Sequence, residues 1–173
     1  APLEFTTGNP DLELYLAGLV ISEVMYNPAN DNQELEFIEV RNVGPLTLDL
    51  TNVRFSNGIE FSFAGSSITS LAPGTSALVV RNLAVFEAHY GINLPVAGEY
   101  RLSTSNNLSN SGERVTLSLG ADGIIRDFRY GDSLRWPRGA DGTGYSLVLR
   151  APESLPDHSL AVNWRSSALP DGN

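Results

Sequence analysis

LSNSGERVTLSLGADGIIRDFRY, residues 108–130, is the stretch that decides the fold. Val115, Leu117 and Leu119 alternate with polar residues, which is the pattern of a strand with one buried face. The GADG sequence that follows predicts a tight reversal of the chain into a second strand. A two-stranded hairpin cannot bury its apolar side alone, so we expect the rest of the chain to supply an opposing sheet.

The second strand of this hairpin has a break in its apolar pattern. Ile124, Phe128 and Tyr130 share one face of a regular strand, and Arg126 interrupts that face. Such an interruption is typical of a strand that starts with a β-bulge or lies at the edge of a sheet. We therefore expect one of these two features here.

The composition indicates a globular chain with an acidic surface. The 173 residues suit one domain with tails, and 42% of them are hydrophobic, which is enough for a substantial core. The net charge is −9, which disfavours nucleic-acid binding because an acidic surface repels phosphate backbones. There is no cysteine, so disulfides and thiolate chemistry are excluded. No apolar run approaches the roughly 18 residues of a membrane span.

Short strand-like segments separated by turn signals continue along the chain. Asn82 is placed to cap one short helix over residues 83–90, and Gly91 to end it. The pattern predicts an all-β sandwich with this single short helix. Besides the two hairpins, the expected strands are 19–26, 34–42, 75–81, 99–103 and 145–150.

The strand expected at residues 34–42 has two apolar phases. Leu35 and Phe37 share one face, whereas Ile38 and Val40 share the other. Either both faces are covered, or a bulge resets the phase so that all four side chains point inward. We favour the bulge, because the charged residues of the segment then face solvent together.

Residues 53–63 predict another hairpin, and the apolar pattern suggests its turn length. A two-residue turn would place Phe55 opposite Glu60 and break the apolar face. A three-residue turn pairs Phe55 with Ile59 instead, with Gly58 in the left-handed conformation. We therefore expect the three-residue turn.

The two ends of the chain predict less structure than its centre. We expect residues 1–18 to be a linker or an edge-strand extension, because leucines at 12, 14 and 16 alternate with other residues. Edge strands of this kind offer a surface for pairing between two copies. The domain is expected to span 19–150. Residues 151–173, rich in proline and serine, are expected to form a surface-docked tail or a linker.

Several motifs follow one another in a distinctive order: ISEVMYNP (21–28), EFIEVRN (36–42), LAPGTSALVVRN (71–82), LSNSGERVTLSLGADGIIRDFRYGD (108–132), WP (136–137), ADGTGYSLVL (140–149) and NWRSS (163–167). A single piece such as LAPG is a weak signal. In their order and spacing, the motifs resemble the bacterial lamin tail domains.

The resemblance implies an immunoglobulin-like β-sandwich of two mainly antiparallel sheets. It also implies an extracellular or cell-surface location, as an accessory module joined to other domains. The family has no agreed catalytic residues, so none is carried over. Animal members meet chromatin and protein partners, but the net charge of this chain argues against nucleic acid.

The residues themselves offer little catalytic machinery. His89 and His158 are the two histidines; they stand apart in the sequence, and we expect both at the surface. No serine lies in a nucleophile-elbow pattern, and there is no glycine-rich phosphate loop. The sequence therefore favours a protein that is not an enzyme and has no cofactor.

Calcium is the sharpest ligand hypothesis from the sequence. Calcium prefers several oxygen ligands and tolerates irregular loops, although asparagine and aspartate are also ordinary turn residues. The candidate ligands are Asn27, Asn30, Asp31, Asn32 and Glu34.

Three further side chains call for an explanation. Glu23 lies in an otherwise apolar pattern, so we expect it to be buried beside an arginine or backbone amides. Trp136 either closes the end of the sandwich or presents an aromatic platform, and we favour closure. Trp164 is expected to anchor the tail to the body.

Taken together, these features favour a non-enzymatic structural or interaction module of a larger secreted or surface protein. Its partners would be other domains of the parent protein or surface proteins. The alternative is a carbohydrate- or calcium-dependent ligand-binding domain, which an exposed aromatic cluster would favour. An enzyme would require a deep pocket with two perturbed carboxylates.

Overall fold

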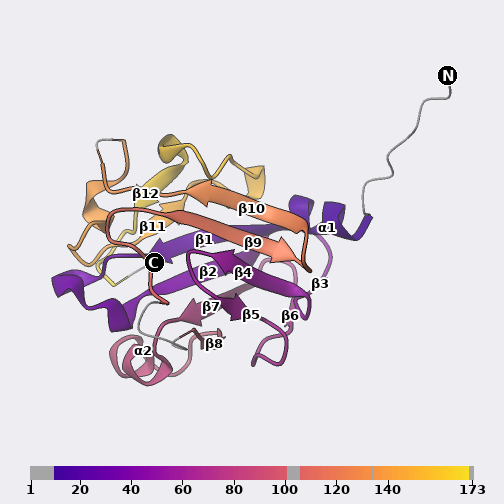
Figure 1. The fold of residues 1–173 in the computed structure, drawn as a ribbon, viewed down its shortest axis with the longest axis horizontal. Coiled ribbons are helices and arrows are strands. Elements are labelled where there is room, and N and C mark those ends of the chain that lie inside the picture. The colour runs from indigo at the N-terminus through magenta and orange to yellow at the C-terminus, as the bar shows by residue number, and fades with distance from the viewer. Residues whose placement is uncertain (1–9, 101–105, 134, 172–173) are drawn as a thin grey trace.

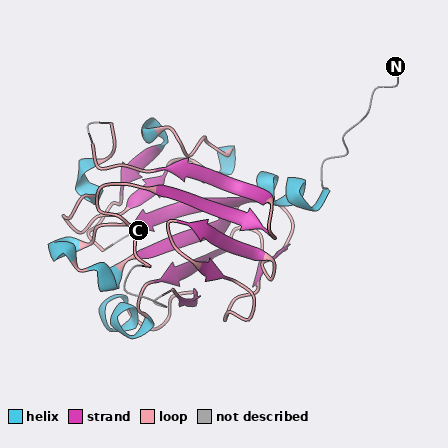
Figure 2. Ribbon diagram, in the orientation of Figure 1, coloured by secondary structure: helices cyan, strands magenta, loops and turns pink. Residues whose placement is uncertain are grey.

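Two β-sheets pack face to face in the computed structural model, which describes residues 10–100, 106–133 and 135–171 (Figures 1 and 2). Within these residues the larger sheet contains, in order, β12 (Trp164–Ser166), β11 (Leu147–Leu149), β1 (Leu19–Met25), β2 (Phe37–Asn42), β7 (Ser76–Val80) and β8 (Val96–Glu99). The smaller sheet contains β10 (Gly123–Arg129), β9 (Arg114–Leu119), β4 (Val53–Asn57) and β5 (Phe61–Ser62). A separate pair is formed by β3 (Leu48–Asp49) and β6 (Ser70–Leu71).

The predicted all-β sandwich is confirmed. Neighbouring strands run antiparallel, except for β7 and β8, which are parallel. The core lies between the sheets, where Val115 and Leu117 of β9 are fully buried. Only the first part of the strand expected at 99–103 is described, as the end of β8; residues 101–103 lie outside the described residues.

The predicted irregularity in the second strand of the 108–130 hairpin is present. β10 is an edge strand, and its register with β9 shifts between Ile124 and Arg126. The extra residue of the bulge reverses which side chains point inward on its N-terminal side, so Ile124 does not share the buried face of Phe128 as expected. Ile125 is therefore buried, whereas Ile124 is 50% exposed.

The bulge expected in β2 is wrong. β2 is regular: Ile38 and Val40 point into the core, and its opposite face is covered at Phe37, which packs under α2 (Leu83–Tyr90). The shift lies in the neighbouring strand β1, between Ile21 and Glu23.

Glu36 was expected to face solvent and is instead fully buried. Its carboxylate accepts hydrogen bonds from the Tyr100 hydroxyl and the Leu108 amide, both at 2.9 Å, and lies 3.9 Å from Arg81 Nη1. Burial raises the pKa of Glu36 to about 8, although these two hydrogen bonds and Arg81 oppose the shift. The side chain joins the larger sheet to the chain that leads into β9.

The 53–63 hairpin has a longer turn than expected. Phe55 pairs with Phe61, not with Ile59. The turn is widened because the backbone of Glu60 pairs with the Asn106 side chain, which accepts from its N–H at 2.9 Å and donates to its carbonyl at 3.2 Å. Gly58 is left-handed, as predicted, with a φ of 85°.

The expected edge strand at residues 12–16 is also wrong, because this segment lies in the helix α1 (Pro10–Gly18). Proline suits the first turn of a helix, and Asp11 and Glu13 favour its positive end. Tyr15 is buried and its hydroxyl donates to the carbonyl of Asp49. The second helix, α2, is confirmed: Asn82 accepts from the Val85 amide at 3.3 Å.

The chain after Arg150 is bound closely to the sandwich. It contains the 3-10 turns η4 (Pro152–Ser154) and η5 (Ala161–Asn163) and then β12, which pairs with β11. Trp164 is 2% exposed and stacks on Phe128 of the smaller sheet, with ring centroids 5.4 Å apart. Trp164 therefore anchors this segment, as expected.

The neighbouring isoleucines of β10 test the phase set by its bulge. We expect Ile125→Ala to lower the free energy of unfolding by about 2–4 kcal/mol, because it opens a cavity in the core. Ile124→Ala should cost less than about 1 kcal/mol, since that side chain is half exposed. Urea unfolding of both variants measures the difference. Equal losses would contradict the observed register.

Candidate functional site

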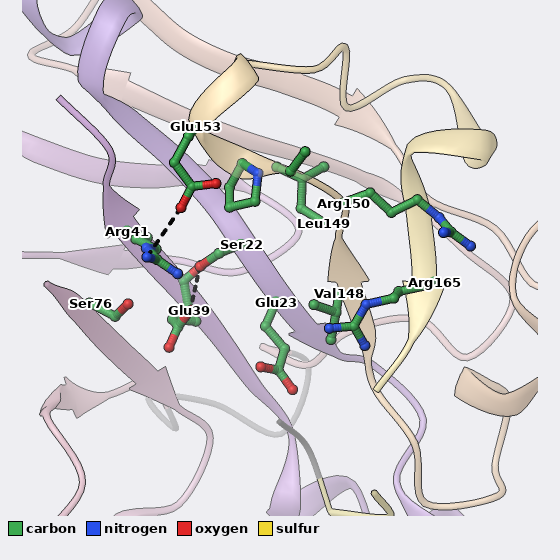
Figure 3. A pocket seen from close by; sticks show the side chains of 12 residues that line it. Ser22, Glu23, Glu39, Arg41, Ser76, Val148, Leu149, Arg150, Glu153 and Arg165 are labelled. Carbon is green, nitrogen blue, oxygen red and sulfur yellow. Dashed lines mark hydrogen bonds and ion pairs between the residues drawn. The ribbon is translucent and has the colours of Figure 1, made fainter. Parts of the chain in front are cut away.

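A groove of about 580 Å³ crosses the outer face of the larger sheet, on the side away from the core (Figure 3). Its lining is mostly polar and charged, and it comes from four strands of the sheet, from β12 and β11 through β1 to β2, with one residue of β7 and the turn η4. The charged residues are Glu23, Glu39, Arg41, Arg150, Glu153 and Arg165.

The floor of the groove is made by the bulge in β1. In a regular strand, Ser22 and Glu23 would point to opposite faces of the sheet. The extra residue brings both side chains to the outer face, where both line the groove. This explains why Glu23 seems to interrupt an apolar pattern in the sequence: the phase changes at the bulge, so Val24 returns to the core.

The two carboxylates of the floor are neighbours on adjacent strands. Glu23 pairs with Glu39 in the register of β1 and β2. Glu23 is 6% exposed and accepts from the Ser146 hydroxyl, while Glu39 accepts from the Ser22 hydroxyl. The predicted burial of Glu23 is confirmed, and the Ser146 hydroxyl is one of its hydrogen-bond donors.

One wall of the groove is the turn η4. Glu153 of this turn forms an ion pair with Arg41 of β2, at 3.2 Å (Figure 3). The turn is flanked by Ala151 and Leu155, with φ values of 45° and 52°. This left-handed conformation is unfavourable for residues with a side chain, and such strain is common where a loop shapes a binding surface.

Two arginines protect the edge of the larger sheet beside the groove. Arg150 Nε donates to the carbonyl of Trp164 at 3.1 Å, and Arg165 Nη1 donates to the carbonyl of Ser166 at 2.9 Å. By the alternation of an antiparallel ladder, these carbonyls point away from β11, since Arg165 is paired with Val148. The arginines therefore occupy acceptors that an added strand would need.

The other half of the outer face is apolar and covered. Met25, Phe37, Leu78 and Val80 pack against Phe86 of α2. The helix thus closes the part of the face next to the groove and leaves the charged part open.

His158 is buried, contrary to the surface position expected from the sequence. Its Nε2 lies 3.1 Å from the carbonyl of Ile21, at the β1 bulge, and its Nδ1 lies 3.1 Å from the carbonyl of Pro156. A neutral imidazole carries one N–H, so it donates to one of the two carbonyls at a time. Burial, followed by the charge of Arg126, lowers the pKa of His158 to about 4.

The five candidate calcium ligands have different surroundings. Asn27 is buried and donates to Asp141 at 2.8 Å; Glu34 lies 3.5 Å from Arg81 and accepts from Asn82 at 2.7 Å. The remaining three, Asn30, Asp31 and Asn32, are exposed. Among the residues that the structure describes, no group of three or more histidine, aspartate or glutamate side chains is placed to hold a metal. Calcium binding at this loop stays a prediction.

The tryptophans close the sandwich and form no platform. Trp136 is half-buried and packs toward Trp164, with ring centroids 6.3 Å apart. The large hydrophobic side chains that are exposed in the described residues are all aliphatic. The exposed aromatic cluster that would favour a sugar ligand is therefore not found in this part of the chain.

The groove is suited to holding charges and brings no nucleophile to an imidazole base. Histidine is not among its described lining residues, and the Ser22 hydroxyl donates to Glu39. Opposite charges stand side by side at fixed positions on a rigid sheet, which suits electrostatic recognition.

Comparison with known proteins agrees with the fold. The model of the Lamin Tail Domain family matches residues 16–132, more than half of the chain. The chain therefore belongs to the Lamin Tail Domain family, whose members are immunoglobulin-like domains. No curated protein and no solved structure matches the chain. In the described residues, no helix is long and apolar enough to cross a membrane.

Sequence reasoning missed most of the groove. Arg41 and Arg165 lie in the motifs EFIEVRN and NWRSS, which give them no binding role, and Glu153 lies in no motif. The three residues come from distant segments, so their meeting depends on the strand order. The sequence marks Glu23 as unusual, but its position in the groove depends on a bulge in β1, whereas the sequence pattern suggests a bulge in β2. The unusual position of this carboxylate was the one available signal.

His158 makes stability depend on pH in a testable way. Its pKa is about 4 in the folded chain and near 6.5 when unfolded, so the unfolded state takes up the proton first as pH falls. The neutral His158 side chain therefore makes its full contribution to the free energy of unfolding above about pH 6.5, and this contribution is lost as the pH falls toward 4. Relative to wild type, His158→Asn should lose about 2–3 kcal/mol less over this range.

Chemical unfolding at several pH values between 4 and 7 measures this difference. His89→Asn is the matched control, since His89 is exposed and lies 3.1 Å from Asp171 on the surface. A parallel decline in wild type and His158→Asn would contradict the assignment.

Proposed function

We propose that this chain is a non-enzymatic interaction module of a larger secreted or cell-surface protein, and that it contacts its partner through the charged groove of the larger sheet. The single observation that carries the proposal is the open half of the outer face: α2 covers the apolar half, while six charged side chains line the rest. An open, polar and rigid surface suits a protein contact better than catalysis.

The location in a secreted or surface protein rests on the sequence resemblance to bacterial lamin tail domains. Membership of the family supports a structural or interaction role. In this proposal, the partner is another domain of the parent protein or a neighbouring surface protein.

Site-specific photo-crosslinking in the intact parent protein tests the contact. Ser76 lines the groove, so a photo-reactive residue at this position should crosslink to another domain or protein, and mass spectrometry identifies the joined peptide. Ser62 on β5, in the opposite sheet, is the control position and should give no such product. Arg165→Glu should lower the yield at Ser76 by about fivefold or more.

Equal crosslinking from both positions, or none from Ser76, would contradict a contact through this groove. An enzyme activity that disappears on Glu23→Gln or Glu39→Gln, with the fold retained, would overturn the non-enzymatic assignment.

A further inference from the structure

We infer that the groove binds an extended polypeptide segment that carries one acidic and one basic side chain four residues apart. This rests on the proposed function and adds the chemistry of the partner. The acidic side chain would lie at Arg165 and the basic side chain at Glu39.

The first support is a row of cross-strand neighbours on the outer face. Arg165 pairs with Val148, Val148 with Glu23, and Glu23 with Glu39. The row therefore runs from positive to apolar to negative across four adjacent strands, β12, β11, β1 and β2, as Figure 3 shows. A partner that lies along it meets the opposite order of charges.

The second support is the spacing of these charges. Adjacent strands lie about 4.8 Å apart, so three steps from β12 to β2 place the backbone of Arg165 about 14 Å from the backbone of Glu39. An extended chain advances about 3.4 Å per residue, and side chains four residues apart point to the same side. An acid and a base at this separation match the two ends of the row.

The third support is that both charged groups retain capacity for hydrogen bonds. Arg165 uses Nη1 for the carbonyl of Ser166, and a guanidinium has five donors. Glu39 accepts from Ser22, and a carboxylate accepts about four hydrogen bonds. Both residues are partly exposed, so a partner can reach them.

The structure also favours a segment lying over the face instead of a strand added to the edge. The carbonyls of Trp164 and Ser166 at the β12 edge already accept from arginines. The turn η4, held by the ion pair of Arg41 and Glu153, raises one wall of the groove. A narrow polypeptide segment can fill this concave groove. A second copy of the chain would present the same concave face and would leave the groove empty.

The test is a titration of the ¹⁵N-labelled chain with acetylated and amidated Gly/Ser peptides, followed by NMR. One peptide carries Asp and Lys four positions apart, in both orders along the chain, and the comparison peptide carries them two positions apart. We expect the first peptide to perturb the amides of Glu39, Val148 and Arg165, in one of the two orders. It should bind at least about fivefold more tightly than the comparison peptide, and more weakly at high salt.

Charge exchange provides the decisive variant. The Arg165→Glu variant should bind the Asp/Lys peptide at least about fivefold more weakly than wild type does. It should also gain binding to a peptide with Lys at both positions. Arg138→Glu, on an exposed turn outside the groove, is the matched control and should behave as wild type. Thermal unfolding verifies that both variants are folded.

Three results would overturn the inference. One is an equal response to the two spacings, another is an Arg165→Glu variant that does not change its preferred peptide, and the third is self-association through the groove in sedimentation. If the peptides fail while the crosslinks from Ser76 remain, the partner chemistry is wrong and the interaction role stands. If both fail, the proposed function is wrong as well.

Discussion

The bulge in β1 is the constraint on which the rest of this structure depends. One additional residue between Ile21 and Glu23 moves a carboxylate from the core to the outer face, where it becomes the floor of the groove. At the same position the carbonyl of Ile21 lies against His158, which joins the C-terminal segment to the sheet. The segment that His158 holds then contributes the η4 wall and β12. A single irregularity thus forms the surface and also fixes the chain that surrounds it.

Buried polar groups fix how the loops and strand ends meet between the two sheets, which hydrophobic packing alone would not specify. Glu36 ties the start of β2 to Tyr100 and to the Leu108 amide, and Asn106 fixes the turn at Glu60. Burying such groups without partners is costly, so a different strand arrangement would leave them unpaired. These hydrogen bonds therefore select one arrangement of loops from the several that the apolar core allows.

The sequence predicts the layers of this fold well, because alternation and turn residues act over a few positions. β9 and α2 with its Asn82 cap follow directly from such local patterns. The errors arise where a distant contact decides: α1 buries Tyr15 against the body, and Asn106 widens the turn after β4. The groove was hidden for the same reason, since Arg165 and Glu39 are 126 positions apart (165 minus 39) and meet only through the strand order.

The strand order also has a consequence for how the molecule is assembled. Among the described strands β1 comes first in the chain, and it lies between β2, which follows it directly, and β11, which begins at Leu147. A growing chain therefore holds one side of β1 without its neighbour until β11 has been synthesised, and such unpaired backbone can pair with a wrong strand. The family match ends at residue 132, and a chain cut at that residue would lack β11 and β12. One edge of β1 would then stay unpaired, so these two strands protect the protein from wrong pairing and also complete the larger sheet.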